Sequence, residues 1–321
     1  MKKAARIHVA GIVQGVGFRP FVYNSALKFG LRGFCLNDSE GVVIEVAGES
    51  IDEFIREIKE NPPELARITH LKVSPIDANE IAAYRGFEIR ESIGQKGLST
   101  LISPDVATCG DCIYELLNPS DRRYLYPFIN CTNCGPRYSI IKDVPYDRPN
   151  TTMAPFRMCL RCGEEYRNAL DRRFHAQPNA CEECGPRLWL AEKGGIASPA
   201  GEINYDAIKR AKTLLKEGAI LAIKGIGGFH LACDAENTDA VKRLREKKRR
   251  SNKPFALMSP DVTEIRSFAE VSDEEESELR KWIRPIVILK KKNAKALSPR
   301  VAPGNACLGV MLPYTPVHHL L

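Results

Sequence analysis

The 321-residue sequence has no long apolar run. No stretch reaches the ~18 apolar residues of a membrane span, and no apolar segment of signal-peptide length follows the basic start MKKAARIHV. Aromatic residues are also scarce, at 7%, and none is interleaved with the basic run KKRR at 247–250. We therefore expect a cytoplasmic protein that does not contact membranes, and nucleic acid is an unlikely partner.

The charge balance leads to the same expectation. The formal net charge is +7, but two metal sites made of four thiolates each would lower it to about +3. An overall basic charge is therefore weak evidence for a nucleic-acid partner. At roughly 100–200 residues per domain, the chain has room for two or three domains.

Cysteine is abundant, with eleven residues, and eight of them form four Cys-x-x-Cys pairs. Successive pairs are separated by 18, 24 and 18 residues, which matches the spacing of structural zinc sites. Redox dithiols are the rival interpretation, but nothing else in the sequence supplies an oxidant or a partner for four such pairs. The candidate zinc ligands are Cys109, Cys112, Cys131, Cys134, Cys159, Cys162, Cys181 and Cys184.

The cysteine region contains an internal repeat with an offset of 50 residues. CTNCGPR recurs as CEECGPR, and NPSDRRY recurs as NALDRRF. The repeat favours two zinc ions bound by consecutive groups of four cysteines, although the spacing leaves interleaved pairing open. We expect His175, in RRFHAQP, to bind or pack rather than to ligate metal. The other cysteines, Cys35, Cys233 and Cys307, lie in apolar runs and are expected in the core.

The first region predicts a ferredoxin-like β-α-β-β-α-β order with one further strand. Ser50 and Glu53 form the pattern of a capping box before an amphipathic helix. The expected strands are 6–13, 33–37, 41–47, 68–74 and 86–91, and the first helix is 19–29.

Between the first strand and the first helix lies the loop GIVQGVGFRP. A glycine-rich turn that enters a helix directs several backbone N–H groups toward one point, which suits a single phosphoryl group, and Arg19 can add a bidentate contact. The alternative is a flexible turn with a surface arginine. The candidate phosphate loop consists of Gln14, Gly15, Val16, Gly17, Phe18 and Arg19.

The last region predicts an α/β arrangement. YDAIKRAKTLLKEG is expected to form a helix that ends at Gly218, and the helix ENTDAVKRLREKKRR is capped by Asn237 or Thr238. PFALM and PIVILKK are expected to form buried strands, separated by one or two helices, with the acidic run SDEEESELRKW on a solvated face. Lys224 at a strand exit, and Lys248, Arg250 and Lys253 before the strand PFALM, are candidate phosphate contacts.

Two stretches resemble known families. The segment HVAGIVQGVGFRPFVYNSALKFGLRGFCLNDSEGVVIEVAG closely resembles the acylphosphatase family. That resemblance implies that Arg19 binds the phosphoryl group and that Asn37 orients the attacking water. From the residues alone, the alternative is that Asn37, in LNDSEG, is a turn residue.

Further along, KGIGGFHLACDA, a Lys-x-Arg pair, RPIVIL and LGVMLPYTP resemble, in this order, the YrdC/Sua5-type domain. The resemblance implies binding of ATP, with Mg as its companion ion, and formation of an acyl-adenylate from a carbamate-type acid. In that interpretation Lys248 and Arg250 contact the triphosphate and the acyl group, and Lys224 and Lys253 are their neighbours.

Taken together, these resemblances identify the chain as a member of the HypF family of carbamoyltransferases, which mature NiFe hydrogenases. An α+β multidomain protein is then expected: an acylphosphatase-like domain at 1–92, a tandem zinc module at 105–190 and an incomplete YrdC-like domain at 200–321. Family members hydrolyse carbamoyl phosphate to carbamate, adenylate it with ATP and pass the carbamoyl group to a C-terminal cysteine of a maturation partner protein. The transfer domain is absent from this sequence, so only part of that activity is expected.

Two alternatives come from other classes. A zinc-containing nucleic-acid-binding or tRNA-modifying YrdC-type protein would account for the zinc pattern and the basic run. A stand-alone acylphosphatase would need only the first region.

Overall fold

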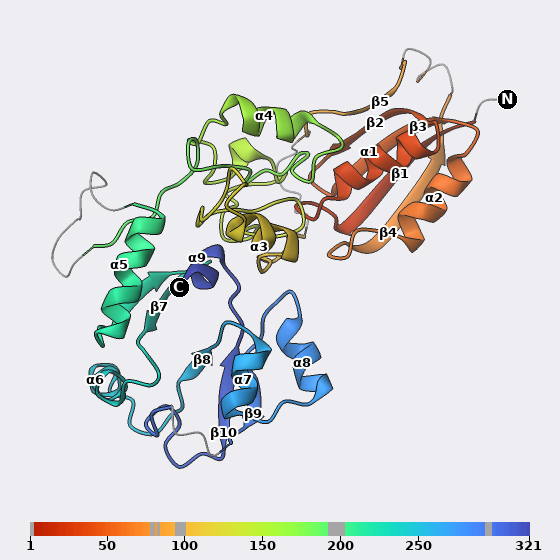
Figure 1. The fold of residues 1–321 in the computed structure, drawn as a ribbon. Coiled ribbons are helices and arrows are strands. Elements are labelled where there is room, and N and C mark those ends of the chain that lie inside the picture. The colour runs from red at the N-terminus through yellow and green to blue at the C-terminus, as the bar shows by residue number, and fades with distance from the viewer. Residues whose placement is uncertain (1–2, 78–80, 82–83, 94–100, 192–202, 293–296) are drawn as a thin grey trace. The chain divides into compact units, whose positions relative to one another are not determined.

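The computed structural model describes residues 3–77, 81, 84–93, 101–191, 203–292 and 297–321. The chain divides into two compact units, and each is described by itself (Figure 1). The first unit comprises Met1–Asp105 and Asn130–Gly185, and the second comprises Val106–Ile129 and Pro186–Leu321. Residues 94–100, half of the linker expected at 92–105, and all of the linker expected at 192–202 lie outside the described residues.

Between residues 3 and 89, the described part of the first unit forms a five-stranded sheet with two helices. The strand order is β4-β1-β3-β2-β5, and only the β2–β5 pair is parallel. The predicted ferredoxin-like order and the α+β fold class are confirmed. The elements are β1 (Lys3–Ile12), α1 (Phe18–Lys28), β2 (Arg32–Asn37), β3 (Gly41–Gly48), α2 (Ile51–Glu60), β4 (Arg67–Pro75) and β5 (Phe87–Ile89).

Helices α1 and α2 cover the same face of the sheet (Figure 1). Alternate residues of β1, such as Ile7 and Val9, are fully buried beneath them, as the two-residue period of a strand requires. From α2, Ile51, Phe54 and Ile58 complete this core. Packing of β1 in this core therefore fixes the direction in which the chain enters the glycine-rich loop.

The capping box expected at Ser50 is wrong. Ser50 is the N-cap of α2, but its side chain makes no capping hydrogen bond. Its ψ of 37° departs from the extended conformation in which an N-cap hydroxyl reaches back to the helix. A complete capping box is present instead in the acidic run, where Ser272 and Glu275 cap each other's backbone N–H groups.

The cysteine-rich part of the first unit has little regular structure. It contains a short 3₁₀ helix, η1 (Arg148–Asn150), and α4 (Leu160–Arg167). Turn hydrogen bonds, such as those from Gly163 N to Cys159 O and from Gly185 N to Cys181 O, hold the cysteine pairs. We call residues 130–185 the finger segment.

The second unit contains a three-stranded sheet in the order β8-β10-β9 and a separate antiparallel pair, β6-β7. β8 and β10 run parallel, and β10 and β9 run antiparallel. The elements are α3 (Gly110–Leu117), α5 (Tyr205–Lys216), β6 (Leu221–Lys224), β7 (Phe229–Ala232), α6 (Thr238–Lys248), β8 (Ala256–Met258), α7 (Val262–Phe268), α8 (Asp273–Arg280), β9 (Val287–Lys290), β10 (Cys307–Met311) and α9 (Pro316–Leu320).

Several boundaries of this unit confirm the sequence prediction. Asn237 caps α6, because its side-chain oxygen accepts a hydrogen bond from the backbone N–H of Ala240. Gly218 follows α5 with a φ of +86°, which glycine adopts without strain. The acidic run forms α8, in which only Leu279 is buried.

Two expectations about burial are wrong. β8 and β9 are not buried along their length: each has one buried residue, Leu257 and Leu289 respectively, and Val287 of β9 is only partly buried against the same core. Cys307 is exposed, since the alternation of β10 points its neighbour Leu308 inward instead. Cys35 is fully buried, as expected, and Cys233 packs at the edge of a core.

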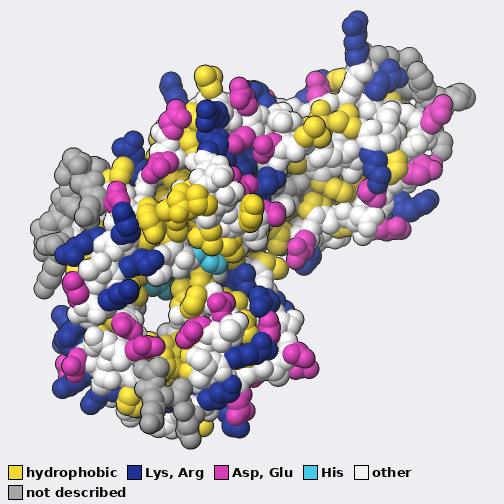
Figure 2. Space-filling view, viewed as in Figure 1, with side chains coloured by type: hydrophobic (Ala, Val, Ile, Leu, Met, Phe, Trp, Pro, Cys, Tyr) yellow, Lys and Arg dark blue, Asp and Glu magenta, His cyan; other side chains and the backbone are white. Residues whose placement is uncertain are grey.

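Among the described residues, no helix is both long enough and apolar enough to cross a membrane. The face shown in Figure 2 carries basic and acidic side chains interspersed with one another. That face therefore does not present the single basic surface that the nucleic-acid alternative requires.

Candidate functional site

The glycine-rich loop connects β1 to α1 and curves back on itself. Gly15 and Gly17 have φ values of +73° and +74°, which side chains other than glycine rarely adopt, and Gly17 is the N-cap of α1. The first N–H groups of an α-helix have no partner within the helix. The side chains of Val16 and Phe18 are buried in the core. The loop can therefore present its backbone N–H groups, rather than these side chains, to a ligand.

Arg19 follows in the first turn of α1 and is only 8% exposed. Its Nη1 donates to Ser92 Oγ at 3.3 Å, and its Nη2 donates to Asp147 Oδ1 at 2.7 Å. The guanidinium is thus fixed by residues far apart in the sequence. A buried guanidinium held in this way is a strong binding group for a dianionic phosphoryl group.

Asn37, at the end of β2, lies against Arg19 and is 1% exposed. With the amide oriented so that its oxygen faces the guanidinium, Oδ1 accepts hydrogen bonds from Nε and Nη2 of Arg19, both at 3.2 Å. That orientation leaves the Nδ2 group of Asn37 to donate elsewhere. The structure therefore brings together the two residues that the sequence singled out.

The side chain of Gln14 makes hydrogen bonds within the protein. Its Nε2 donates to the carbonyl oxygens of Asp38 and Gly41 at 2.7 and 2.8 Å. Its Oε1 accepts a hydrogen bond from the backbone N–H of Tyr146 at 3.0 Å. Gln14 thus joins the loop to the β2–β3 turn and to the finger segment.

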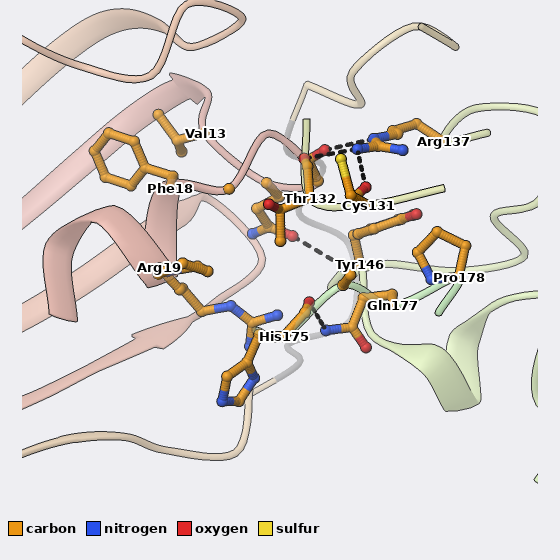
Figure 3. Close-up of a pocket in the computed structure, with 15 residues that line it drawn as sticks. Val13, Phe18, Arg19, Cys131, Thr132, Arg137, Tyr146, His175, Gln177 and Pro178 are labelled. Carbon is orange, nitrogen blue, oxygen red and sulfur yellow. Dashed lines mark hydrogen bonds between the residues drawn. The ribbon is translucent and has the colours of Figure 1, made fainter. Parts of the chain in front are cut away.

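The finger segment forms the opposite wall of the pocket (Figure 3). Arg137, which is 2% exposed, donates from Nε to the carbonyl oxygen of Gly15 at 2.7 Å. Its Nη groups donate to the carbonyl oxygens of Cys131, Thr132 and Cys134. A single guanidinium therefore connects a cysteine pair to the phosphate loop.

His175 lies on the same wall, and Figure 3 shows its ring beside the guanidinium of Arg19. Burial, reinforced by the nearby charge of Arg19, lowers the pKa of His175 to about 4, so the imidazole is neutral at pH 7. His175 belongs to neither of the two groups of cysteines, which agrees with the expectation that it does not ligate metal.

The sequence did not reveal the part played by Arg137, Tyr146 and Asp147. In the sequence, Arg137 is one of two arginines that end the repeated CGPR, and nothing there distinguishes it from its counterpart Arg187, which is exposed in the structure. The stretch YDRPN at 146–150 has no counterpart at an offset of 50 residues. That break in the repeat is the signal that could have found Asp147.

The eight paired cysteines form two groups, and within each group the ligand atoms lie within 4.8 Å of one another. The sequential grouping favoured by the repeat is confirmed: Cys109, Cys112, Cys131 and Cys134 form one group, and Cys159, Cys162, Cys181 and Cys184 form the other.

The sulfur geometry fits a tetrahedral metal ion. Sγ–Sγ distances are 3.7 Å for Cys131–Cys134 and Cys162–Cys184, and 3.8 Å for Cys159–Cys181 and Cys181–Cys184. Four thiolates at about 2.3 Å from a central zinc ion would be separated by about 3.8 Å. The distances are far too long for disulfides. Two such four-cysteine clusters are consistent with zinc-finger modules.

The candidate ATP contacts lie in the second unit. Lys224, at the end of β6, is exposed and lies over the ring of Phe229. Lys248 and Lys253 are exposed at and after the end of α6. Arg250 differs from both, because its Nη2 donates to Pro254 O and its buried Nε has no hydrogen-bond partner in the described part of the chain.

Sequence models of three families match the chain. The acylphosphatase family matches residues 5–89, and the HypF finger family matches 108–141 and 158–191. The family described as telomere recombination, which includes Sua5, YciO and YrdC, matches 213–321.

Relatives match over nearly the whole chain. A carbamoyltransferase HypF of Rhodobacter capsulatus is 51% identical over 99% of this chain and 41% of its own length. A crystal structure of full-length HypF in the phosphate- and nucleotide-bound form superimposes with a TM-score of 0.91 and 50% identity, over all of this chain and 41% of that one. HypF of T. kodakarensis gives a TM-score of 0.85 and 46% identity, over 99% and 40%. The chain thus spans about two fifths of the length of these relatives.

The cysteine geometry predicts that Cys162→Ser removes one of two bound metal ions per chain. Metal content measured by mass spectrometry after dialysis should fall by half, while Cys307→Ser, which changes an exposed cysteine outside both groups, should leave it unchanged. Equal metal content in both variants would contradict the assignment of ligands.

The pairing of Asp147 with Arg19 predicts that Asp147→Asn tightens the binding of inorganic phosphate. The substitution keeps an acceptor for Arg19 but removes a negative charge that competes with the anion. We expect a roughly three- to tenfold lower Kd at low salt, the size of a partly exposed charge interaction. Isothermal titration measures it. Asp143→Asn, which changes an exposed carboxylate of the same segment, is the control. Weaker phosphate binding by Asp147→Asn would contradict the prediction and show that Asp147 only positions Arg19.

Proposed function

The chain belongs to the HypF family of carbamoyltransferases, and we propose that its first unit hydrolyses carbamoyl phosphate to carbamate and phosphate. The observation that carries this proposal is the convergence of the glycine-rich loop, Arg19 and Asn37 on one pocket. The HypF relative crystallised in a phosphate-bound form supports a phosphate ligand for this family.

The proposed reaction needs positioning and charge stabilisation more than a strong base, because an acyl phosphate already has a good leaving group. Arg19 and the backbone N–H groups of residues 15–19 hold the phosphoryl oxygens. Asn37 donates from Nδ2 and orients the attacking water. A bond forms from the water oxygen to phosphorus, the bond from phosphorus to the acyl oxygen breaks, and carbamate leaves with that electron pair.

The remaining functions are proposed from the family and the sequence. The cysteine groups hold zinc, and zinc fixes the backbone of the finger segment. The three predicted domains, 1–92, 105–190 and 200–321, correspond to hydrolysis, zinc binding and the binding of ATP with Mg. In the whole enzyme the carbamoyl-adenylate would then supply a cysteine of a hydrogenase maturation partner, in the cytoplasm.

Arg19→Ala and Asn37→Ala are each expected to lower kcat/KM for carbamoyl phosphate about 10²- to 10³-fold, because each removes a group that stabilises the transition state. Release of inorganic phosphate measures the rate. Arg56→Ala, an exposed arginine of α2, should behave like the unsubstituted chain. If the unsubstituted chain releases no phosphate, the assignment of the first unit is wrong.

For the second unit, Lys248→Ala is expected to weaken the binding of ATP with Mg about tenfold, since a charge-assisted phosphate contact is lost. Fluorescence of a labelled ATP analogue measures the Kd. Lys242→Ala, an exposed lysine of the same helix, is the matched control. Equal loss in both variants would show a general effect of charge and would contradict a specific contact.

A further inference from the structure

His175 lines the pocket beside Arg19, but it has no role in the proposed hydrolysis. Its Nδ1 is buried and has no hydrogen-bond partner among the residues that the structure describes. An unpaired buried nitrogen is costly, and native proteins usually satisfy such atoms. In a pocket that binds a ligand, the missing partner is most simply an atom of that ligand.

The position of the ring is fixed from several sides. Tyr166 and Phe174 contact it with ring centroids at 4.9 and 4.7 Å. Gln177 Nε2 donates to the backbone carbonyl of His175 at 2.9 Å. The backbone of His175 has a φ of +54°, a conformation that is unfavourable for histidine and that surrounding contacts must maintain. Strain of this kind is characteristic of functional positions.

The groups that face His175 determine what it can bind. Arg19 contributes a positive charge, and Asp147 has one carboxylate oxygen committed to Arg19. In the tautomer that carries its proton on Nε2, the neutral imidazole presents Nδ1 as an acceptor for an uncharged N–H donor. A phosphoryl oxygen on Arg19 would not supply such a donor, but the amino group of a carbamoyl phosphate would.

We propose that His175 is the residue that selects carbamoyl phosphate: its Nδ1 accepts a hydrogen bond from the amino group of a substrate whose phosphoryl group lies on Arg19. This inference rests on the proposed function of the first unit. It assigns the finger segment a direct contact with substrate in addition to its cysteine clusters. An alkyl acyl phosphate, with a methyl group in place of the amino group, leaves Nδ1 unsatisfied and is disfavoured.

The test compares carbamoyl phosphate with acetyl phosphate in two variants that both tolerate the positive φ. His175→Gly removes the acceptor, and His175→Asn keeps one, because its Oδ1 can replace Nδ1. The ratio of kcat/KM for carbamoyl over acetyl phosphate should fall about tenfold in His175→Gly and should be largely restored in His175→Asn. His70→Asn is the control for His175→Asn, because His70 is an exposed histidine of β4. His70→Gly is not used, since it would not match the backbone conformation of residue 175.

The outcomes separate the two proposals. An equal loss for both substrates in His175→Gly, or no change for either, overturns the selective role of His175 while the proposed hydrolysis stands. An unsubstituted chain that hydrolyses neither substrate overturns the proposed function itself. Inorganic phosphate binding, measured in parallel, should be unchanged in both variants, because the phosphoryl contacts of Arg19 remain, and its loss would show that His175 is only structural.

Discussion

The guanidinium of Arg137 holds the candidate site together. It donates to the carbonyl of Gly15 in the phosphate loop and to the carbonyls of Cys131, Thr132 and Cys134 in a Cys-x-x-Cys pair. Because this arginine is buried, hydrogen bonds to those carbonyl dipoles offset the cost of burying its charge. The loop and the finger segment are therefore coupled. The wall that carries Asp147 and His175 depends on that coupling.

In the pocket, the guanidinium of Arg19 lies beside a neutral imidazole, His175, and a carboxylate that is already paired with it, Asp147. Arg19 is paired with Asp147, and this pairing avoids an isolated buried charge. A phosphoryl group brings its own negative charge and can take over that compensation. His175 stays neutral because burial and the adjacent positive charge of Arg19 both oppose its protonation.

Much of this could be predicted from the sequence. The alternating apolar residues of β1 and the glycines of the loop follow from local rules, and they predicted both the fold and the anion site. The spacing and repeat of the cysteines predicted two metal clusters and their sequential grouping. Local rules failed at Ser50 and at Cys307, where a cap conformation and the face of a strand depend on the packing around them.

The sequence by itself determined which residues could bind phosphate and metal, because strand period, glycine placement and cysteine spacing act over a few neighbouring residues. Only the tertiary structure decided what lies opposite Arg19. Asp147 is 128 residues away along the chain, and its contact depends on the backbone path of the finger segment. The same holds for His175, whose unpaired nitrogen becomes meaningful only where its ring faces the phosphate loop.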